Sequence, residues 1–234
     1  MPYFKYNEKI IEYTLSRNAK KNVNFRVKSS GEICISAPKY VRKSELDSMI
    51  LERAEWLVKN QEKVKNKKTN LAPTNIQNAS HIYLNGQKYY IKITSGKINS
   101  VHFKDNLLIL QIKENYKNSQ NYINNYLDKW LKEVTYILSN RIIDNFLPLF
   151  DKYHINKPEL AIRTMTGRWG SCTPSKNKII INKNLIYPPH KCLEYVVVHE
   201  LAHLVEANHS KKFYNIIEEM IPDWKTRKKI LNDF

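Results

Sequence analysis

The chain has 234 residues, of which 42% are hydrophobic and 26% are charged. These fractions are ordinary for a globular protein and exclude a disordered chain or a fibrous repeat. Because 39 Lys+Arg face only 22 Asp+Glu, the formal net charge is +17. Such a charge favours an anionic partner, either a nucleotide or a nucleic acid bound without sequence specificity.

Two features of the sequence predict where the protein works. No run approaches the ~18 apolar residues that a membrane span needs, and the N-terminal segment lacks the continuous apolar core of a signal peptide. The cysteines, Cys34, Cys172 and Cys192, are odd in number and far apart, so we expect no disulfide framework. These features predict a cytoplasmic protein with no membrane partner.

The first third of the chain predicts strands followed by one helix. Apolar and polar residues alternate over 23–37, which predicts a hairpin turning at residues 29–31. Residues 44–58 place apolar side chains at helical spacing, with Ser44 as the expected N-cap. Residues 61–75 are rich in Lys and Asn without periodicity, so they predict an exposed connector.

Strands return in the middle of the chain and are followed by a long helix. Residues 81–93 predict a hairpin around Asn85-Gly86, and residues 101–112 predict another strand pair. An apolar stripe from Ile123 to Leu138 predicts an amphipathic helix that starts near Ser119. We therefore divide the chain into a β-rich N-terminal portion with one helix, 1–115, and a C-terminal catalytic portion, 116–234.

The last quarter of the chain holds the residues suited to catalysis. A β-branched strand at Ile179–Ile181 is followed by Pro188-Pro189, and residues 190–206 predict a helix that is apolar nearly all round. This helix contains His199-Glu200-Leu201-Ala202-His203, the H-E-x-x-H pattern.

The spacing of this pattern predicts a catalytic zinc site. His199 and His203 are about one turn apart, so both imidazoles leave the same helix face and can hold one Zn²⁺. Glu200 lies about 100° further round, where it can act as general base on a metal-activated water and not as a ligand. Burying two imidazoles and a carboxylate among valines would be costly without a metal.

A catalytic zinc site needs a third protein ligand. His209 completes the spacing H-E-x-x-H-x5-H, although Glu206 stands where the metzincin motif has glycine. We expect Asn208 to adopt a left-handed conformation and return His209 to the metal. The alternative third ligand is Glu218 or Glu219 on the following helix.

At this point the chain resembles the YgjP-like metallopeptidases, which are related to the SprT-like and WLM zinc proteases. The resemblance is carried by RWGSC (168–172), KIIINKNLI (178–186), YVVVHELAHL (195–204) and NHSKKF (208–213), and extends over about 15–230 as one domain. It implies an α+β fold with a zincin-like catalytic core, one Zn²⁺ on the three histidines and Glu200 as catalytic base. It also implies that the strand at 179–184 lines the cleft, where an extended peptide adds to its edge.

Four more residues are candidates for roles near the metal. Arg168 and Trp169 can bind substrate, with core packing as the alternative for Trp169. Cys172 is expected to be a small buried hydrophobe and not a further ligand. Tyr214, where the family usually has tryptophan, can donate a hydrogen bond to an oxyanion, with packing as the alternative.

A metal-bound imidazole usually donates its second N–H to an acceptor that orients the ring. Asp223 and Glu194 are the candidates for that acceptor.

These features predict a zinc hydrolase, with a peptide or protein as the first choice of substrate. One alternative keeps the metal and hydrolyses a nucleoside triphosphate, which the net charge favours although no Gly-rich phosphate loop is present. Another is a DNA-associated protease or binding module like the SprT-like relatives, whose binding would weaken with salt. A purely structural zinc site is disfavoured, because such sites are closed by four protein ligands.

Overall fold

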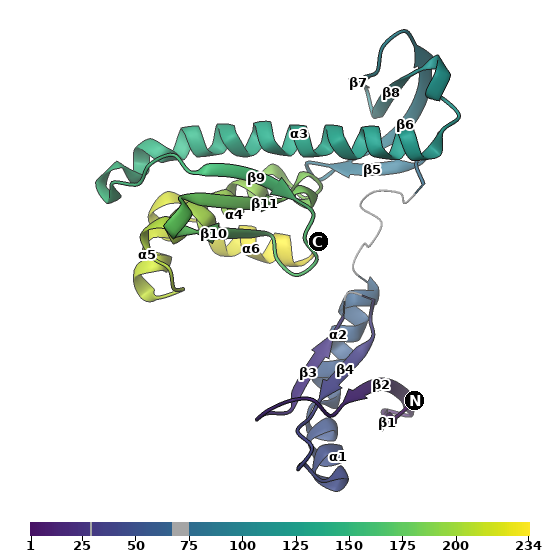
Figure 1. Cartoon of the computed structure of the whole chain (residues 1–234), viewed down its shortest axis with the longest axis vertical. Helices are drawn as coiled ribbons and strands as arrows, with labels where there is room; N and C mark the ends of the chain where they lie inside the picture. The colour runs from purple at the N-terminus through teal and green to yellow at the C-terminus, as the bar shows by residue number, and fades with distance from the viewer. Residues whose placement is uncertain (29, 67–74) are drawn as a thin grey trace. The chain divides into compact units, whose positions relative to one another are not determined.

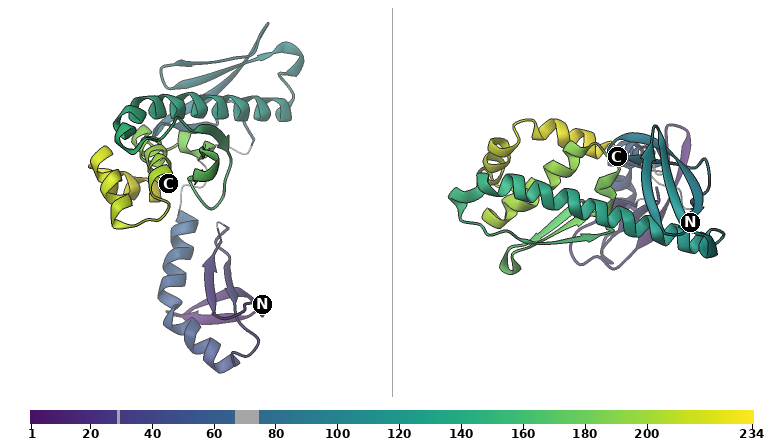
Figure 2. Two further views of the ribbon diagram at one scale, coloured as in Figure 1. Left: turned by 60° about the vertical axis from the view of Figure 1, so that its left-hand side comes forward. Right: turned by 90° about the horizontal axis from the view of Figure 1, so that it is seen from above.

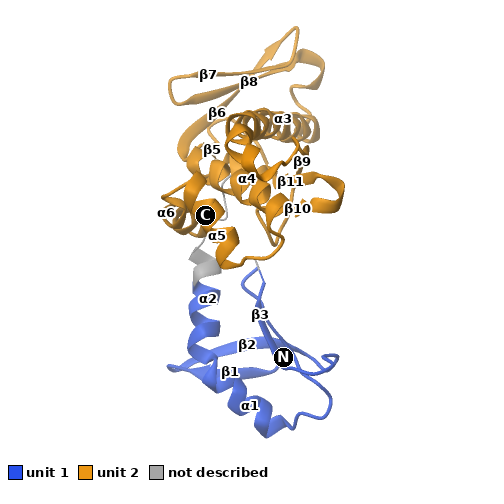
Figure 3. Ribbon diagram, turned by 90° about the vertical axis from the view of Figure 1, so that its left-hand side faces the viewer, with its two compact units in different colours: residues 1–69 blue, residues 70–234 orange. Residues whose placement is uncertain are grey.

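The computed structural model describes residues 1–28, 30–66 and 75–234. Its contacts divide the chain into two compact units, residues 1–69 and 70–234 (Figure 3). Each unit combines helices with a β-sheet, so the α+β class predicted from the sequence is confirmed. Among the described helices, none is both long enough and apolar enough to cross a membrane.

The first unit packs two helices against a four-stranded sheet. The strands β1 (Tyr3–Tyr6), β2 (Lys9–Ser16), β3 (Asn24–Val27) and β4 (Ile33–Ser36) lie in the order β1-β2-β4-β3. The pair β3–β4 is the hairpin that the sequence predicts over 23–37. Its alternation places Ile33 and Ile35 in the core of this unit.

The single helix predicted over 44–58 is wrong, because the structure has α1 (Lys43–Glu52) and α2 (Ala54–Asn66). The chain leaves the helical conformation at Arg53, and this break lets apolar residues of both helices pack into one core. Arg42 and not Ser44 is the N-cap residue, and it makes no side-chain capping bond. Part of the predicted connector, 61–66, is helical, and its residues 67–74 lie outside the described residues.

A second four-stranded sheet begins the larger unit. It comprises β5 (His81–Leu84), β6 (Gln87–Gly96), β7 (Ser100–Lys104) and β8 (Leu107–Lys113), in the order β5-β6-β8-β7. The turn at Asn85-Gly86 has positive φ at both residues, 53° and 79°, which is the type I′ geometry that Asn-Gly favours. The backbone N–H groups of this turn donate to the carbonyl oxygens of Ile186 and Tyr187, so the turn packs against the segment that precedes the metal-ligand helix.

The helix α3 (Gln120–Phe146) connects this sheet with the C-terminal part of the larger unit, residues 159–232 (Figures 1 and 2). The first half of α3 packs into the core formed by the sheet β5-β6-β8-β7. Its second half packs into a core shared with the elements that follow α3 in the chain. Buried Lys183 also pairs with Asp128 on α3. The contacts therefore divide the chain at 69/70 and not after residue 115, where the predicted boundary cuts through this packing.

The C-terminal part of the larger unit, residues 159–232, is a three-stranded sheet packed against helices. The strands β9 (Glu159–Arg163), β10 (Gly170–Thr173) and β11 (Lys178–Asn182) lie in the order β10-β11-β9, followed by α4 (His190–Val205), α5 (Lys211–Met220) and α6 (Trp224–Asn232). The segment 179–184, predicted to line the cleft with a free edge, forms most of the central strand. The two edge strands are β10 and β9, and β10 packs against α4.

Candidate metal centre

The helix α4 lies in the core of the C-terminal part of the larger unit because few of its positions are polar. Nine of its side chains are buried: Cys192, Leu193, Tyr195, Val196, Val197, Val198, Glu200, Leu201 and Ala202. The helix therefore presents its two histidines and Glu200 from a largely buried element. Such an element holds catalytic groups more firmly than a loop does.

The structure brings His199, His203 and His209 together. The first two lie one turn apart on α4, and one ligand nitrogen from each of the three lies within 4.8 Å of the others. The Nε2 atoms of His199 and His209 are 3.1 Å apart, close to the separation of two ligands on one zinc ion.

The chain reaches His209 by a route that differs from the prediction. Glu206 is extended, with φ −135° and ψ 108°, and it ends α4. The prediction of a left-handed Asn208 is wrong, because Asn208 is not among the described residues with positive φ. An extended residue at 206 needs no glycine, which explains how glutamate is tolerated at this position of the motif.

Burial keeps the two helical imidazoles neutral, which is the form that binds a metal. Burial lowers the pKa of His199 to about 3, with smaller contributions from His203 and His209. The pKa of His203 is also lowered, again chiefly by burial. A pair of neutral imidazoles offers lone pairs to a metal at neutral pH.

A backbone carbonyl orients one of these rings. The Nδ1 of His203 lies 3.1 Å from the carbonyl oxygen of Glu206, so Nδ1–H donates there and Nε2 is free to bind a metal. The predicted orienting residues, Asp223 and Glu194, are wrong for this role, because both carboxylates pair with Arg227. Sequence reasoning missed the Glu206 carbonyl because a backbone acceptor carries no side-chain signal.

The ring of Phe213 packs against the rings of all three histidines. It is fully buried, and its ring centroid lies 4.9, 4.5 and 4.8 Å from those of His199, His203 and His209. Ser210 begins α5 as its N-cap and accepts a hydrogen bond from the Phe213 N–H at 3.3 Å. The short loop after α4 is therefore held at both His209 and Phe213.

Tyr214 lies behind His209 and is not among the residues that line the cavity. Its ring stacks on His209 at 6.1 Å and on Trp224 at 5.1 Å. The structure therefore places Tyr214 in the packing role that was the alternative to oxyanion binding. Tyr195, which the sequence reasoning missed, lines the cavity and also stacks on Trp224, at 6.4 Å.

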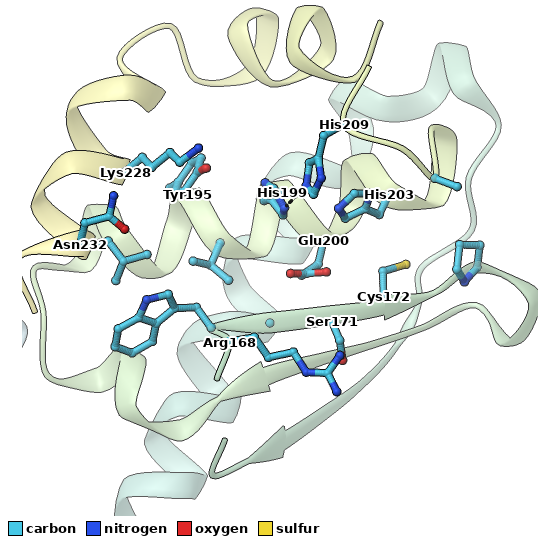
Figure 4. Close-up of a pocket in the computed structure, with 16 residues that line it drawn as sticks. Arg168, Ser171, Cys172, Tyr195, His199, Glu200, His203, His209, Lys228 and Asn232 are labelled. Carbon is cyan, nitrogen blue, oxygen red and sulfur yellow. Dashed lines mark hydrogen bonds between the residues drawn. The ribbon is translucent and has the colours of Figure 1, made fainter. Parts of the chain in front are cut away.

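Glu200 faces the cavity from α4 and lies against the backbone of β10 (Figure 4). Its side chain is so close to Gly170 that a Cβ built there would meet the Glu200 Cγ at 2.8 Å. Burial raises the pKa of Glu200 to about 8, and the positive charge of Arg168 opposes that shift. Glycine in the RWGSC segment therefore makes room for the carboxylate, a role that only the packing of β10 on α4 reveals.

A cavity of about 500 Å³ opens in front of these residues, a volume within the range of small-molecule sites. Arg168, Trp169 and Cys172 line it from the sheet side, and Lys228 and Asn232 line it from α6 (Figure 4). Trp169 is half-buried and also packs against the core, so both predicted roles apply to it. Burial raises the pKa of Cys172 to about 12, which makes its thiolate a poor candidate for a further ligand.

The alternative third ligands lie elsewhere on α5. Glu219 pairs with Lys152, and neither Glu218 nor Glu219 lines the cavity or joins the cluster of ligand atoms. The donor set is therefore three imidazole nitrogens, a set that suits zinc. The Nδ1 of His199 is buried without a hydrogen-bond partner in the described structure.

Two neutral imidazoles on a buried helix and a third imidazole on the loop after it, with a carboxylate beside them facing one cavity, define a metallohydrolase of the H-E-x-x-H type. The chain belongs to the YgjP-like family, because the description "YgjP-like, metallopeptidase domain" matches residues 21–234. This membership implies a bound metal, and the helices and sheets described above have the α+β fold that the resemblance predicts.

The chain is also similar to individual proteins. A protein of Escherichia coli (strain K12) named UTP pyrophosphatase is 34% identical over 103 residues, which are 42% of this chain and 62% of that protein. The match thus spans less than two thirds of this relative. Two solved structures are metallopeptidase zymogens, abylysin of Pyrococcus abyssi and jannalysin of Methanocaldococcus jannaschii. Their TM-scores are 0.34 and 0.35 at 19% and 20% identity, over 39% and 41% of this chain and 87% and 89% of theirs.

Proposed function

We propose that this metallohydrolase acts on nucleoside triphosphates and cleaves a phosphoanhydride bond. The observation that carries the proposal is the charge of the cavity. Among the described residues that line it, Glu200 is the one carboxylate, whereas Arg168 and Lys228 both contribute positive charge. A relative named UTP pyrophosphatase supports the same substrate class. The sequence alone favours a peptide, and the cavity's charge supports the triphosphate alternative.

The histidines would hold the metal, and Glu200 would handle the proton. A zinc ion bound by His199, His203 and His209 supplies Lewis acidity for activating water and for stabilising charge on phosphoryl oxygens. Glu200 accepts the proton of the attacking water as its oxygen bonds to phosphorus and the bond from that phosphorus to the bridging oxygen breaks. A carboxylate whose pKa is raised by burial suits a base that works near neutral pH.

The two cations would bind the phosphates. The guanidinium of Arg168 offers several donors in a fixed plane, which suits bidentate contact with phosphate oxygens. Lys228 lies across the cavity on α6 and provides a second, more mobile charge (Figure 4). Together they offset the negative charge that a triphosphate brings into the cavity.

Hydrolysis of a peptide is the second candidate, because the edge strand β10 lines the cavity through Gly170, Ser171 and Cys172. In the described sheet only one edge of β10 is paired, with β11. An extended peptide can add to such an edge with its backbone hydrogen bonds. The family's description as a metallopeptidase domain supports this candidate.

Association with DNA stays a prediction that depends on the net charge of +17. Its mark would be binding to duplexes of unrelated sequence with an affinity that falls steeply as salt is raised.

The test is a two-substrate assay on the zinc-loaded chain. One arm supplies each common nucleoside triphosphate and measures released phosphate and pyrophosphate, and the other supplies an unfolded protein. Glu200→Gln is expected to abolish hydrolysis and to keep its zinc. Glu218→Gln, an equal change at an exposed site outside the cavity, is the matched control and is expected to keep full activity.

Release of phosphate or pyrophosphate by the wild type, absent in Glu200→Gln, would support the proposal. Cleavage of the protein alone, again lost in Glu200→Gln, would overturn it in favour of the peptidase. Equal activity of both variants in either arm would remove Glu200 from the chemistry.

A further inference from the structure

The loop between β9 and β10 forms a second hollow beside the metal cavity. Residues 164–168 line this hollow, whose volume is about 450 Å³. Arg168 lines both hollows, so the two adjoin at this residue. The sequence TMTGR at these positions contains no carboxylate, and four of its five residues are exposed.

A buried amide holds this loop from the inside. Asn182, at the end of β11, is 2% exposed. Its Nδ2 donates to the carbonyl oxygens of Met165 at 2.8 Å and of Arg168 at 2.9 Å, and its Oδ1 lies 3.4 Å from the Met165 N. Its backbone N–H donates to the Trp169 oxygen at 2.9 Å. The side chain therefore fixes the loop at both ends.

These bonds determine where the loop's own donors point. In a trans peptide the C=O and the following N–H point in opposite directions, and none of the described peptide bonds is cis. Because the carbonyls of Met165 and Arg168 point at Asn182, the N–H groups of Thr166 and Trp169 point away from it. In the described part of the chain these two N–H groups have no hydrogen-bond partner.

Free backbone donors, a guanidinium and an absence of carboxylates in the lining are the features of an anion site. Carbonyl oxygens would repel an anion, and Asn182 turns two of them inward. A phosphate group has several acceptor oxygens and can take both backbone and guanidinium donors at once.

We propose that the loop 164–168 is a subsite for the phosphate groups of the substrate beyond the bond that is cleaved, and that Asn182 is its positioning residue. This inference rests on the proposed function, because it takes the substrate to be a nucleoside triphosphate. Arg168, shared by the two hollows, is the side chain that contacts the phosphates. The leaving phosphate or pyrophosphate then departs through the hollow that residues 164–168 line, away from Glu200.

The test measures binding of inorganic pyrophosphate to the zinc-loaded full chain by calorimetry, at one fixed salt concentration, with Glu200→Gln throughout to prevent turnover. Adding Arg168→Ala is expected to weaken binding by about tenfold or more, the usual effect of losing charge-assisted hydrogen bonds. Arg163→Ala removes the same charge from an exposed residue that lines neither hollow, and is expected to bind within about twofold of its parent.

Two further readouts test the role of Asn182. Pyrophosphate is expected to shift the amide NMR resonances of Thr166 and Trp169 in the parent, and Asn182→Ala is expected to lose these shifts and weaken binding while keeping its zinc. If Asn182→Ala fails to fold, the comparison of Arg168→Ala with Arg163→Ala and the parent's own shifts decide the matter. Equal weakening by the two arginine variants, or unshifted amides, would overturn the subsite.

The same variants, made with Glu200 intact, separate this inference from the proposed function. A rise in KM for triphosphate in Arg168→Ala, absent in Arg163→Ala, supports both. Pyrophosphate binding with the expected pattern but no triphosphate hydrolysis keeps the subsite and overturns the function. Triphosphate hydrolysis with an unchanged KM in Arg168→Ala keeps the function and overturns the subsite.

Discussion

Replacement of Gly170 by alanine tests whether the close approach of β10 holds Glu200 in place. The new Cβ would lie 2.8 Å from the Glu200 Cγ and 2.9 Å from its Cδ, whereas ordinary contacts begin at 3.4 Å. The pairing of Gly170 with Ile181, which is fully buried, opposes a retreat of the strand. Glu200 must therefore shift by at least the 0.6 Å that separates 2.8 from 3.4 Å.

A shift of this size is large for a catalytic group, since a misplacement of about 1 Å can lower a rate by about 100-fold. We expect Gly170→Ala to lower kcat by about 10- to 100-fold on whichever substrate the wild type hydrolyses. Its zinc content, measured by mass spectrometry of the metal, is expected to match the wild type, because the three atoms nearest to the new methyl group all belong to Glu200 and not to a histidine. A crystal structure of the variant would show the displaced carboxylate directly.

Gly167→Ala is the matched reference, because a Cβ built at that glycine meets nothing within 4 Å. The loss of kcat in Gly170→Ala is therefore taken relative to this variant, which carries the same added methyl group. A Gly170→Ala protein that folds, keeps zinc and retains the kcat of Gly167→Ala would refute the reasoning.

Further expectations concern the metal, the pH dependence and the loop. A competition titration with a chelator should show that His209→Ala lowers zinc affinity by at least about 100-fold. This loss exceeds the usual effect of removing a residue that only hydrogen-bonds to a metal ligand. Glu219→Ala should leave the zinc affinity unchanged. In the metal-free chain burial holds the pKa of His199 near 3 against 6.5 and that of Glu200 near 8 against 4.5. Compared with the folded chain, the unfolded chain therefore binds more protons at His199 below pH 6.5 and fewer protons at Glu200 above pH 4.5. The free energy of unfolding should be highest between pH 4.5 and pH 6.5. It should fall on either side of this range by up to about 1.4 kcal/mol per pH unit. Denaturant titrations should show that Glu200→Gln removes the alkaline decline, and a decline that persists would contradict this assignment. Asn182→Ala should lower the free energy of unfolding by about 2–4 kcal/mol, because it strands two inward carbonyl groups, and a loss under about 0.5 kcal/mol would contradict the clamp.

Much of the fold could be predicted because the signals are local. The Asn85-Gly86 turn and the hairpin over 23–37 depend on residues that are neighbours in sequence, and the structure confirms both. The long helix begins after Ser119 as expected, because its apolar stripe is contained within one element. Helical periodicity also places His199 and His203 on one face without any knowledge of the rest of the protein.

Other predictions failed because they concern contacts between distant segments. The run of β-branched residues Ile179–Ile181 identifies a strand, but its place at the centre of the sheet depends on β9 and β10 pairing with its two edges. The break at Arg53 and the boundary at 69/70 are likewise results of packing. No periodic pattern within the sequence records which neighbour a strand or helix will have.

The chain's sequence by itself determined the H-E-x-x-H-x5-H ligand set, because helix geometry converts that spacing into a shared face. Only the tertiary structure decided what surrounds it: the glycine that makes room for Glu200, the carbonyl that orients His203, and the buried Asn182 that turns the Arg168 loop outward. Each of these depends on two segments brought within a few ångströms by packing of the core. Ligand spacing is a property of one helix, whereas orientation and electrostatics belong to the assembled site.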